Sequence, residues 1–355
     1  MAVLITGAGL IGRHVAAELA ARGESVTLVD RRPPPIALPP GVRFAAGDIA
    51  DMAFMQAQVA ELGVCDIVNT AAVLAVTARE DPPLAVRTNL LAAVQLLDMA
   101  RQGRIRRLVL ASSSSINSAA YRSDDVVPIP EDFEARVLSQ GPGSFYIASK
   151  LAMEHFCQLY RNSFGVSAVA LRFGAVLGAA GWGDVSLVAR LALRIVSAAR
   201  AQQPLAIEDQ RLLWEGKEEF LDPRDAAVAV AATLAAGDLP QTSYNITSPR
   251  AVSIDELFGQ AREAFPGLIT TLPVAPKGGF LNFPHPRTSP TDVSAAKRDL
   301  GFEAGRSAKD ALIYLNEQLP LEVEATCRAA SSSMRAPVAP TGWPQPIRPL
   351  SSEDG

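Results

Sequence analysis

The stretch that decides the fold is Val3-Leu4-Ile5-Thr6-Gly7-Ala8-Gly9-Leu10-Ile11-Gly12, close to the start of the chain. The aliphatic run before Thr6 predicts a buried strand, and the apolar residues after Gly12 predict a helix. In such a unit Gly7 permits a tight turn, Gly9 lets the backbone approach a diphosphate, and Gly12 lets the helix pack on the strand. Leu10 and Ile11 lie next to the N-terminus of this helix, and the partial positive charge at that N-terminus would meet the phosphates. The stretch therefore predicts a dinucleotide-binding fold.

The second expected strand, residues 25–29, ends in Asp30. At this distance from the glycine loop a carboxylate can accept hydrogen bonds from an adenosine ribose, although a turn residue at a strand end is the alternative. The carboxylate would repel a phosphate on that ribose, which favours NAD as the cofactor. Arg31 and Arg32 follow at once and could attract that phosphate, so NADP stays the less favoured alternative.

Strand-like and helix-like stretches alternate through the next part of the chain. Strands are expected at residues 42–46, 66–68 and 108–111, with helices near 51–62 and 83–101 between them. This alternation predicts an α/β protein with a doubly wound parallel (Rossmann) sheet. Short segments follow these strands, namely Asp48 and Ile49, then residues 69–72 and 112–115, and all of these residues except Ile49 are polar or small. An open sheet of this kind places its ligands at these strand ends.

Tyr146 and Lys150 stand four residues apart, one helical turn on the same face. A tyrosine hydroxyl titrates near ~10 and needs a neighbouring cation to act as a base at neutral pH. With a dinucleotide loop in the same domain, the pair predicts redox chemistry on a carbon–oxygen bond. Tyr146 would be the acid/base, and Lys150 would lower its pKa and hold the nicotinamide ribose. The alternative is a surface aromatic followed by a surface lysine.

Further polar residues complete the expected site. Ser113 is expected to donate a hydrogen bond to the reacting oxygen, with Ser112, Ser114 and Ser115 as alternatives. Asn89 would sit inside a helix, where asparagine is unfavourable, so it predicts a buried hydrogen-bonding role near the active site. The substrate is expected to contact Ser113, Ser114, Tyr146 and Trp182. The segments 121–144 and 178–184 are expected to line its pocket.

These motifs, in this order, resemble the extended short-chain dehydrogenase/reductases, also called NAD-dependent epimerase/dehydratases, over roughly residues 1–317. The resemblance implies catalytic roles for Ser113, Tyr146, Lys150 and Asn89. It also implies a homodimer formed through the helix near 83–101 and the helix that begins at Tyr146. From the residues and the resemblance together, we expect the cofactor to contact Gly7, Gly9, Leu10, Ile11, Gly12, Asp30, Arg31, Asp48, Ile49, Ala71, Ala72, Asn89, Tyr146, Lys150 and Phe173.

Departures from the family pattern bear on the substrate. Sugar-nucleotide enzymes of the family carry an asparagine and a tyrosine-glycine-proline run where this chain has residues 175–178, Ala-Val-Leu-Gly. They carry an arginine where this chain reads Lys217-Glu218-Glu219. A diphosphate needs donors and positive charge, which this stretch does not supply, so a nucleotide sugar is disfavoured. The glycine loop is also one residue shorter than the usual TGxxGxxG, without an obvious loss of a phosphate contact.

Length and composition indicate how many domains the chain can form and which partners it does not bind. With 355 residues, 48% of them hydrophobic, the chain can bury one large core or two modest ones. We expect a dinucleotide-binding domain over residues 1–174, and some later segments also belong to it. A smaller C-terminal α/β substrate lobe is expected over 175–317 and a Pro/Ser-rich tail over 318–355. The net charge of −4 and the lack of a basic tract argue against nucleic acid.

Localisation and metal content can also be predicted. No apolar run has the length of a membrane span, and the first strand leaves no room for a signal peptide. The three cysteines are scattered, as in a cytoplasmic protein with reduced thiols. The three histidines lie far apart, so no metal site is expected.

The sequence thus predicts an NAD-dependent oxidoreductase that transfers hydride between nicotinamide and a hydroxyl or carbonyl carbon of a small polar substrate, such as a sugar, sugar acid or polyol. One alternative is an NAD-dependent epimerase or dehydratase with tightly bound NAD. A second is a non-catalytic NAD-sensing protein, since fold alone does not assign activity. A sensor, however, has no need of Tyr146 and Lys150.

Overall fold

A seven-stranded parallel sheet forms the centre of the computed structural model, which describes residues 1–34, 36–64, 66–122, 128–133, 144–181, 184, 186–283 and 285–320. The strand order is β10-β6-β5-β4-β1-β2-β3, and each neighbouring pair is parallel. The chain reverses its direction across the sheet between β1 and β4, the point where doubly wound sheets bind ligands. This confirms the predicted Rossmann sheet. Its strands are β1 (Ala2–Thr6), β2 (Ser25–Asp30), β3 (Val42–Ala46), β4 (Asp66–Asn69), β5 (Arg107–Ser113), β6 (Ala168–Phe173) and β10 (Ser243–Ile246).

Helices cover both faces of this sheet. Alternate side chains along each strand point to opposite faces, so Val3 and Ile5 join one apolar cluster while Leu4 joins another. The first cluster takes in α1 (Leu10–Ala21), α8 (Pro223–Ala235) and α10 (Ser294–Leu300). The second takes in α2 (Met52–Leu62), α5 (Ala92–Arg101) and α6 (Phe145–Phe164). The sheet is therefore buried on both faces, as its apolar strands require.

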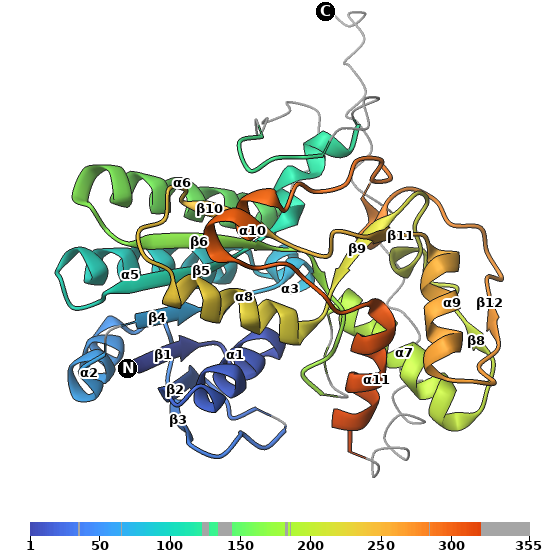
Figure 1. The fold of residues 1–355 in the computed structure, drawn as a ribbon, viewed down its shortest axis with the longest axis horizontal. Coiled ribbons are helices and arrows are strands. Elements are labelled where there is room, and N and C mark those ends of the chain that lie inside the picture. The colour runs from blue at the N-terminus through green and yellow to red at the C-terminus, as the bar shows by residue number, and fades with distance from the viewer. Residues whose placement is uncertain are drawn as a thin grey trace, which may run out of the picture.

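A smaller lobe lies at the end of the sheet opposite the start of β1 (Figure 1), and so beyond the carboxyl ends of the parallel strands. It has its own apolar cluster, in which Trp214, Phe220 and Phe280 contact one another edge to face. Its elements are β7 (Ala175–Val176), α7 (Leu187–Ala201), β8 (Leu205–Ala206), η3 (Gln210–Leu212), β9 (Glu218–Leu221), β11 (Ala251–Val252), α9 (Ile254–Ala264), β12 (Thr270–Thr271), η4 (Phe280–Asn282) and α11 (Ala308–Gln318). The strands form two small sheets, β11-β9-β7 and β12-β8.

The helix expected near residues 83–101 forms without a break, but it is not α-helical throughout. After α3 (Ala75–Glu80), the chain forms α4 (Pro82–Ala85), then a single π-helical stretch, η1 (Val86–Leu91), and then α5. A π turn accommodates one extra residue, which changes the direction of the side chains within it. Here it turns Asn89 into the protein interior while Leu91 stays exposed. Periodicity alone does not reveal such an insertion.

Some predictions fall wholly or partly outside the described residues. These are Trp182, the tail after Pro320, and the expected pocket-lining segments 121–144 and 178–184, of which only part is described. The serine strand β5 continues into the 3-10 stretch η2 (Ser114–Arg122). Within the described part of the chain, no helix has both the length and the apolar character needed to cross a membrane.

Candidate active site

The three glycines of the first loop lie in three different environments. Gly7 has a φ of +91°, and a Cβ there would lie 2.6 Å from the Ala71 nitrogen. A Cβ on Gly12 would lie 1.9 Å from the Gly7 oxygen, so helix and strand pack against each other through this residue. A Cβ on Gly9 would meet nothing within 4 Å. Open space therefore lies beside Gly9, which is the N-cap of α1, where a diphosphate is expected to approach.

Asp30, at the end of β2, links that strand to the glycine loop. The Ala8 amide donates to Asp30 Oδ2 over 2.7 Å, while Asp30 Oδ1 accepts only a longer bond of 3.3 Å from the Arg32 amide among the described residues. Arg31 is exposed. The carboxylate therefore keeps an oxygen that can accept a ribose hydroxyl.

The other expected cofactor contacts follow neighbouring strand ends. Asp48, after β3, accepts from the Ala50 amide over 2.9 Å and pairs with Arg87 at 3.3 Å. Ile49 is buried beside it. Ala71 and Ala72 follow β4 and are half-buried. Since Thr6 pairs with both Val29 and Asn69 in the sheet, the ends of β1, β2 and β4 are adjacent.

Tyr146 and Lys150 lie in the first turns of α6, which is capped by Ser144. Burial raises the pKa of Tyr146, and a hydrogen bond with the Ser113 hydroxyl opposes this in part. Burial also lowers the pKa of Lys150 to about 8. The Lys150 ammonium donates to the Ala111 carbonyl over 2.6 Å and lies 5.8 Å from the centre of the Tyr146 ring. Burial thus has the largest effect on the pKa of Tyr146 in this structure, and the lowering expected from Lys150 stays a prediction.

The four serines after β5 can now be distinguished. Ser113 is the one whose hydroxyl opposes the rise in the Tyr146 pKa, and its Oγ lies 2.8 Å from Ser115 Oγ. Ser112 and Ser114 are buried. The geometry therefore favours Ser113 among the alternatives. Phe173 pairs with Ser113 across the sheet, but its side chain is buried in the core, so only its backbone can face a cofactor.

Asn89 lies behind these groups. Its Oδ1 accepts from the Val73 amide over 2.7 Å, and its Nδ2 donates to the Val73 carbonyl and to Ser149 Oγ over 2.9 and 3.1 Å. Ser149 Oγ in turn donates to the Tyr146 carbonyl over 2.7 Å. The Asn89 amide is thus used within the protein, and it positions the start of α6 rather than contacting reacting atoms.

The charged groups near the substrate lobe are paired internally. Arg172 forms a buried ion pair with Glu154 at 2.8 Å and donates to the Glu131 carbonyl over 2.7 Å, so it is not placed to bind a substrate carboxylate. Arg287 forms ion pairs with both Glu218 and Glu219. Burial raises the pKa of Glu218 and the Arg287 charge opposes this, so two buried carboxyl groups already share one guanidinium.

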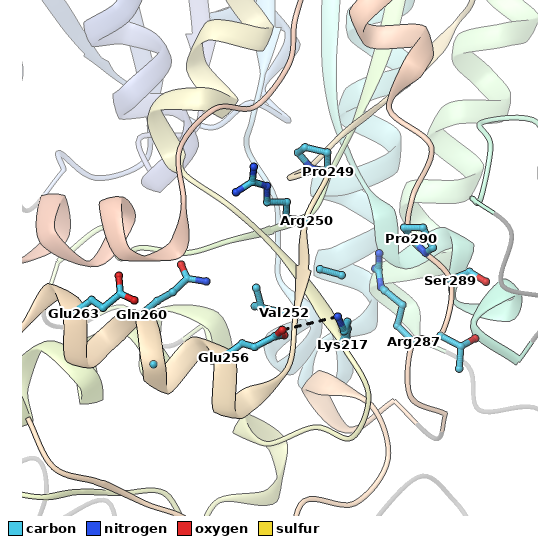
Figure 2. A pocket seen from close by; sticks show the side chains of 13 residues that line it. Lys217, Pro249, Arg250, Val252, Glu256, Gln260, Glu263, Arg287, Ser289 and Pro290 are labelled. Carbon is cyan, nitrogen blue, oxygen red and sulfur yellow. Dashed lines mark ion pairs between the residues drawn. The ribbon is translucent and has the colours of Figure 1, made fainter.

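A pocket of about 740 Å³ lies elsewhere in the smaller lobe, between α9, β11 and the segment that carries Arg287 (Figure 2). Lys217 and Glu256 face each other there, with their charged atoms 3.9 Å apart. None of the predicted site residues lines this pocket. The candidate active site is therefore the sheet edge that carries Gly9, Ser113 and Tyr146.

The structure adds polar residues that the sequence interpretation left without a role. Thr70 bonds the glycine loop, Ser115 bonds Ser113, and Ser149 connects Asn89 to α6. Arg13, directly after Gly12, is buried and donates to the Ala179 carbonyl over 3.4 Å. Ser149 could have been found from its place between Tyr146 and Lys150. Ser115 lies only two residues from Ser113, whereas Thr70 and Arg13 depend on contacts between distant segments, which spacing along the chain does not show.

A parallel dinucleotide-binding sheet with a Ser-Tyr-Lys group at its carboxyl edge defines an enzyme of the extended short-chain dehydrogenase/reductase type. The chain belongs to the NAD dependent epimerase/dehydratase family, whose model matches residues 3–247. NAD is the cofactor of this family, and the open space beside Gly9 and the available oxygen of Asp30 fit its diphosphate and ribose.

Relatives and solved structures agree with this family. The UDP-glucose 4-epimerase of Corynebacterium glutamicum is 33% identical over 185 residues, which is 51% of this chain and 53% of that protein. The chain thus spans about half the length of the first curated relatives it matches. The structure of MoeE5 in complex with UDP-glucuronic acid and NAD is 27% identical, with a TM-score of 0.68 over 93% of this chain and all of that chain. A GalE-like L-threonine dehydrogenase from Cupriavidus necator, 22% identical with a TM-score of 0.72 over 89% of this chain and 99% of that chain, shares the fold.

Proposed function

We propose that this protein transfers hydride between NAD and a hydroxyl or carbonyl carbon of a small polar substrate, such as a sugar, sugar acid or polyol. The observation that supports this most is the grouping of Ser113, Tyr146 and Lys150 at the same sheet edge as the glycine loop, with the Lys150 ammonium 5.8 Å from the centre of the Tyr146 ring. A sensor of NAD would not require this arrangement.

In the oxidative direction, Tyr146 accepts the hydroxyl proton of the substrate as the hydride leaves its carbon. NAD, when bound, supplies the hydride acceptor. Ser113 donates a hydrogen bond to the substrate oxygen and keeps it next to Tyr146. Lys150 carries the charge that favours the phenolate, and with a pKa of about 8 it is mostly protonated at neutral pH.

The cluster of Glu218, Glu219 and Arg287 supports a substrate without a diphosphate. Its two carboxyl groups already pair with the guanidinium of Arg287, which leaves less positive charge for a diphosphate. The second candidate is an epimerase or dehydratase that acts on a UDP-sugar with tightly bound NAD. The relatives favour it, since those named above include a UDP-glucose 4-epimerase and a protein complexed with UDP-glucuronic acid.

One assay distinguishes these candidates. Purified protein is incubated with NAD and either free sugars, sugar acids and polyols or UDP-glucose and UDP-glucuronic acid, and both NADH absorbance and product composition are measured. We expect NADH from a free substrate and none from its Tyr146→Phe variant. Conversion of a UDP-sugar without NADH release, by protein that copurifies with NAD, would establish the epimerase instead. If the wild type bound NAD but turned over no substrate, and Tyr146→Phe bound NAD with the same affinity, the sensor would be favoured.

We also propose a homodimer formed by η1, α5 and α6. Large apolar side chains are exposed on these helices, including Leu159 at 56% and Phe164 at 57%. Val86, Leu91 and Phe156 add to the same set. Water contact with so many apolar groups on adjacent helices is unfavourable, and a symmetric partner would remove it.

Light scattering tests this assembly. Leu159→Glu should shift the mass from dimer to monomer, because it places a charge in the apolar contact. Ile269→Glu is the matched control, since Ile269 is equally exposed but lies outside these helices. A wild-type monomer at micromolar concentration would refute the proposal.

The remaining assignments are proposals of the same kind. Residues 1–174, with α8, β10 and α10, would form the cofactor domain, and residues 175–317 would supply the substrate lobe, which has its own apolar cluster. A cytoplasmic location is supported by Cys157, a buried free thiol whose pKa burial raises to about 12. Limited proteolysis with and without NAD would test the domain boundary.

A further inference from the structure

Thr70, the residue after β4, contacts the end of β1 and the glycine loop through its amide and its hydroxyl. Its amide donates to the Thr6 carbonyl over 2.8 Å. Its hydroxyl has one hydrogen, which is shared between the Thr6 carbonyl at 2.7 Å and the Gly7 carbonyl at 3.0 Å. The bond to Gly7 is the one that involves the loop itself, and none of the chemistry proposed above requires it.

The Gly7 carbonyl belongs to a peptide unit that is held at both ends. The C=O of Gly7 and the N–H of Ala8 lie in one plane and point in opposite directions. Thr70 Oγ1 bonds the oxygen, and Asp30 Oδ2 accepts from the nitrogen over 2.7 Å. Two side chains from different strands therefore fix the orientation of one peptide plane.

The surroundings of this peptide show why it needs to be held. Gly7 has a positive φ and no side chain, so its following peptide can rotate at low cost. Gly12 packs directly on the Gly7 oxygen, and a Cβ at Gly12 would also lie 2.7 Å from Thr70 Oγ1. A rotated peptide would turn the Gly7 oxygen toward the Asp30 carboxylate and disturb the start of α1.

We propose that Thr70 is a positioning residue of the cofactor site, which with Asp30 holds the Gly7–Ala8 peptide in the orientation that receives the NAD diphosphate. A loop ordered in advance does not lose conformational freedom when the ligand binds, and this strengthens binding. The inference rests on the proposed cofactor contacts of the glycine loop. It assigns a role to a side chain that does not itself contact NAD.

The test compares Thr70→Val, which keeps the side-chain shape but removes the hydroxyl, with Thr70→Ser, which keeps the hydroxyl. Dissociation constants for NAD, ADP and adenosine are measured by calorimetry, and thermal unfolding is recorded without ligand. Thr70→Val should weaken NAD and ADP by about 5- to 10-fold, comparable to one lost hydrogen bond. Adenosine has no phosphate, so Thr70→Val should bind it with wild-type affinity. Thr70→Ser should bind NAD within about twofold of the wild-type affinity.

Four results would overturn the proposal. Thr70→Val could bind NAD as the wild type does, it could lose adenosine and NAD affinity equally, or Thr70→Ser could be as impaired as Thr70→Val. The second result would mean that Thr70 only supports the fold, as would a large loss of thermal stability in Thr70→Val without ligand. A wild-type protein that binds neither NAD nor ADP would contradict the proposed function itself, which separates the two failures.

Discussion

Gly9→Ala should weaken NAD binding and leave the stability of the protein unchanged, whereas Gly12→Ala should lower its stability. The two residues are only about one helical turn apart. At Gly9 the new methyl group enters open space, and the φ of −73° suits any residue. Alanine is a slightly poorer N-cap than glycine, but it reduces the entropy of the unfolded chain by about 0.4–1 kcal/mol. The two terms nearly cancel, so the melting temperature should change by less than about 2 °C.

At Gly12 the same methyl group would lie 1.9 Å from the Gly7 oxygen, a backbone atom that Thr70 holds in place. Overpacking of this kind typically costs about 1–3 kcal/mol, and a contact with fixed backbone belongs at the upper end. With about 2–4 °C per kcal/mol for a domain of this size, Gly12→Ala should lower the melting temperature by roughly 6–12 °C.

Cofactor affinity provides the second measurement. The Gly9 methyl would occupy the space proposed for the diphosphate, so NAD should bind at least about tenfold more weakly, a loss of ~1.4 kcal/mol. Calorimetry with NAD and thermal unfolding without it, on both variants and the wild type, give the full comparison. If Gly9→Ala bound NAD with wild-type affinity, the diphosphate would not pass over Gly9 and the reasoning would fail.

Three further predictions concern the catalytic helix and its neighbours. Tyr146→Phe should reduce turnover by about 10²–10⁴-fold and leave the NAD dissociation constant unchanged, because it removes only the acid/base oxygen. The pKa of Lys150 is about 8 in the folded protein and 10.5 in the unfolded chain. Between these pH values the folded state binds fewer protons than the unfolded state, so the free energy of unfolding should rise with pH. Urea unfolding of Lys150→Met across the window should not show this rise. Arg172→Met leaves Glu154 buried without its partner and should cost about 3–5 kcal/mol in urea unfolding, whereas a loss below about 1 kcal/mol would contradict the buried pair.

The sequence predicted those parts of the site that depend on local geometry. The roles of Gly7 and Gly12 follow from backbone conformation and close packing within one strand–loop–helix unit, and the structure has both features. The parallel sheet followed from the alternation of apolar strands and helices, which reflects burial on both faces.

Other features could not be predicted because they depend on segments far apart in the chain. The pKa of Tyr146 depends on how the core packs around its ring, which spacing to Lys150 does not reveal. The Arg172 side chain pairs with Glu154 and with the Glu131 carbonyl, and both partners lie far from it along the chain. The choice of Ser113 among four serines likewise required the position of α6.

The π turn at Val86–Leu91 links the interior of the protein to its surface. Each residue in an α-helix rotates the next by 100°, so the extra residue of the π turn sets the rotation of α5 relative to α4. Removing one residue there would restore an ordinary α-helix, turn Asn89 away from Val73, and rotate the exposed apolar residues of the helix together. A one-residue deletion in this segment would therefore alter the support of the catalytic helix and the proposed subunit contact in the same step, which makes the length of this segment as constrained as its composition.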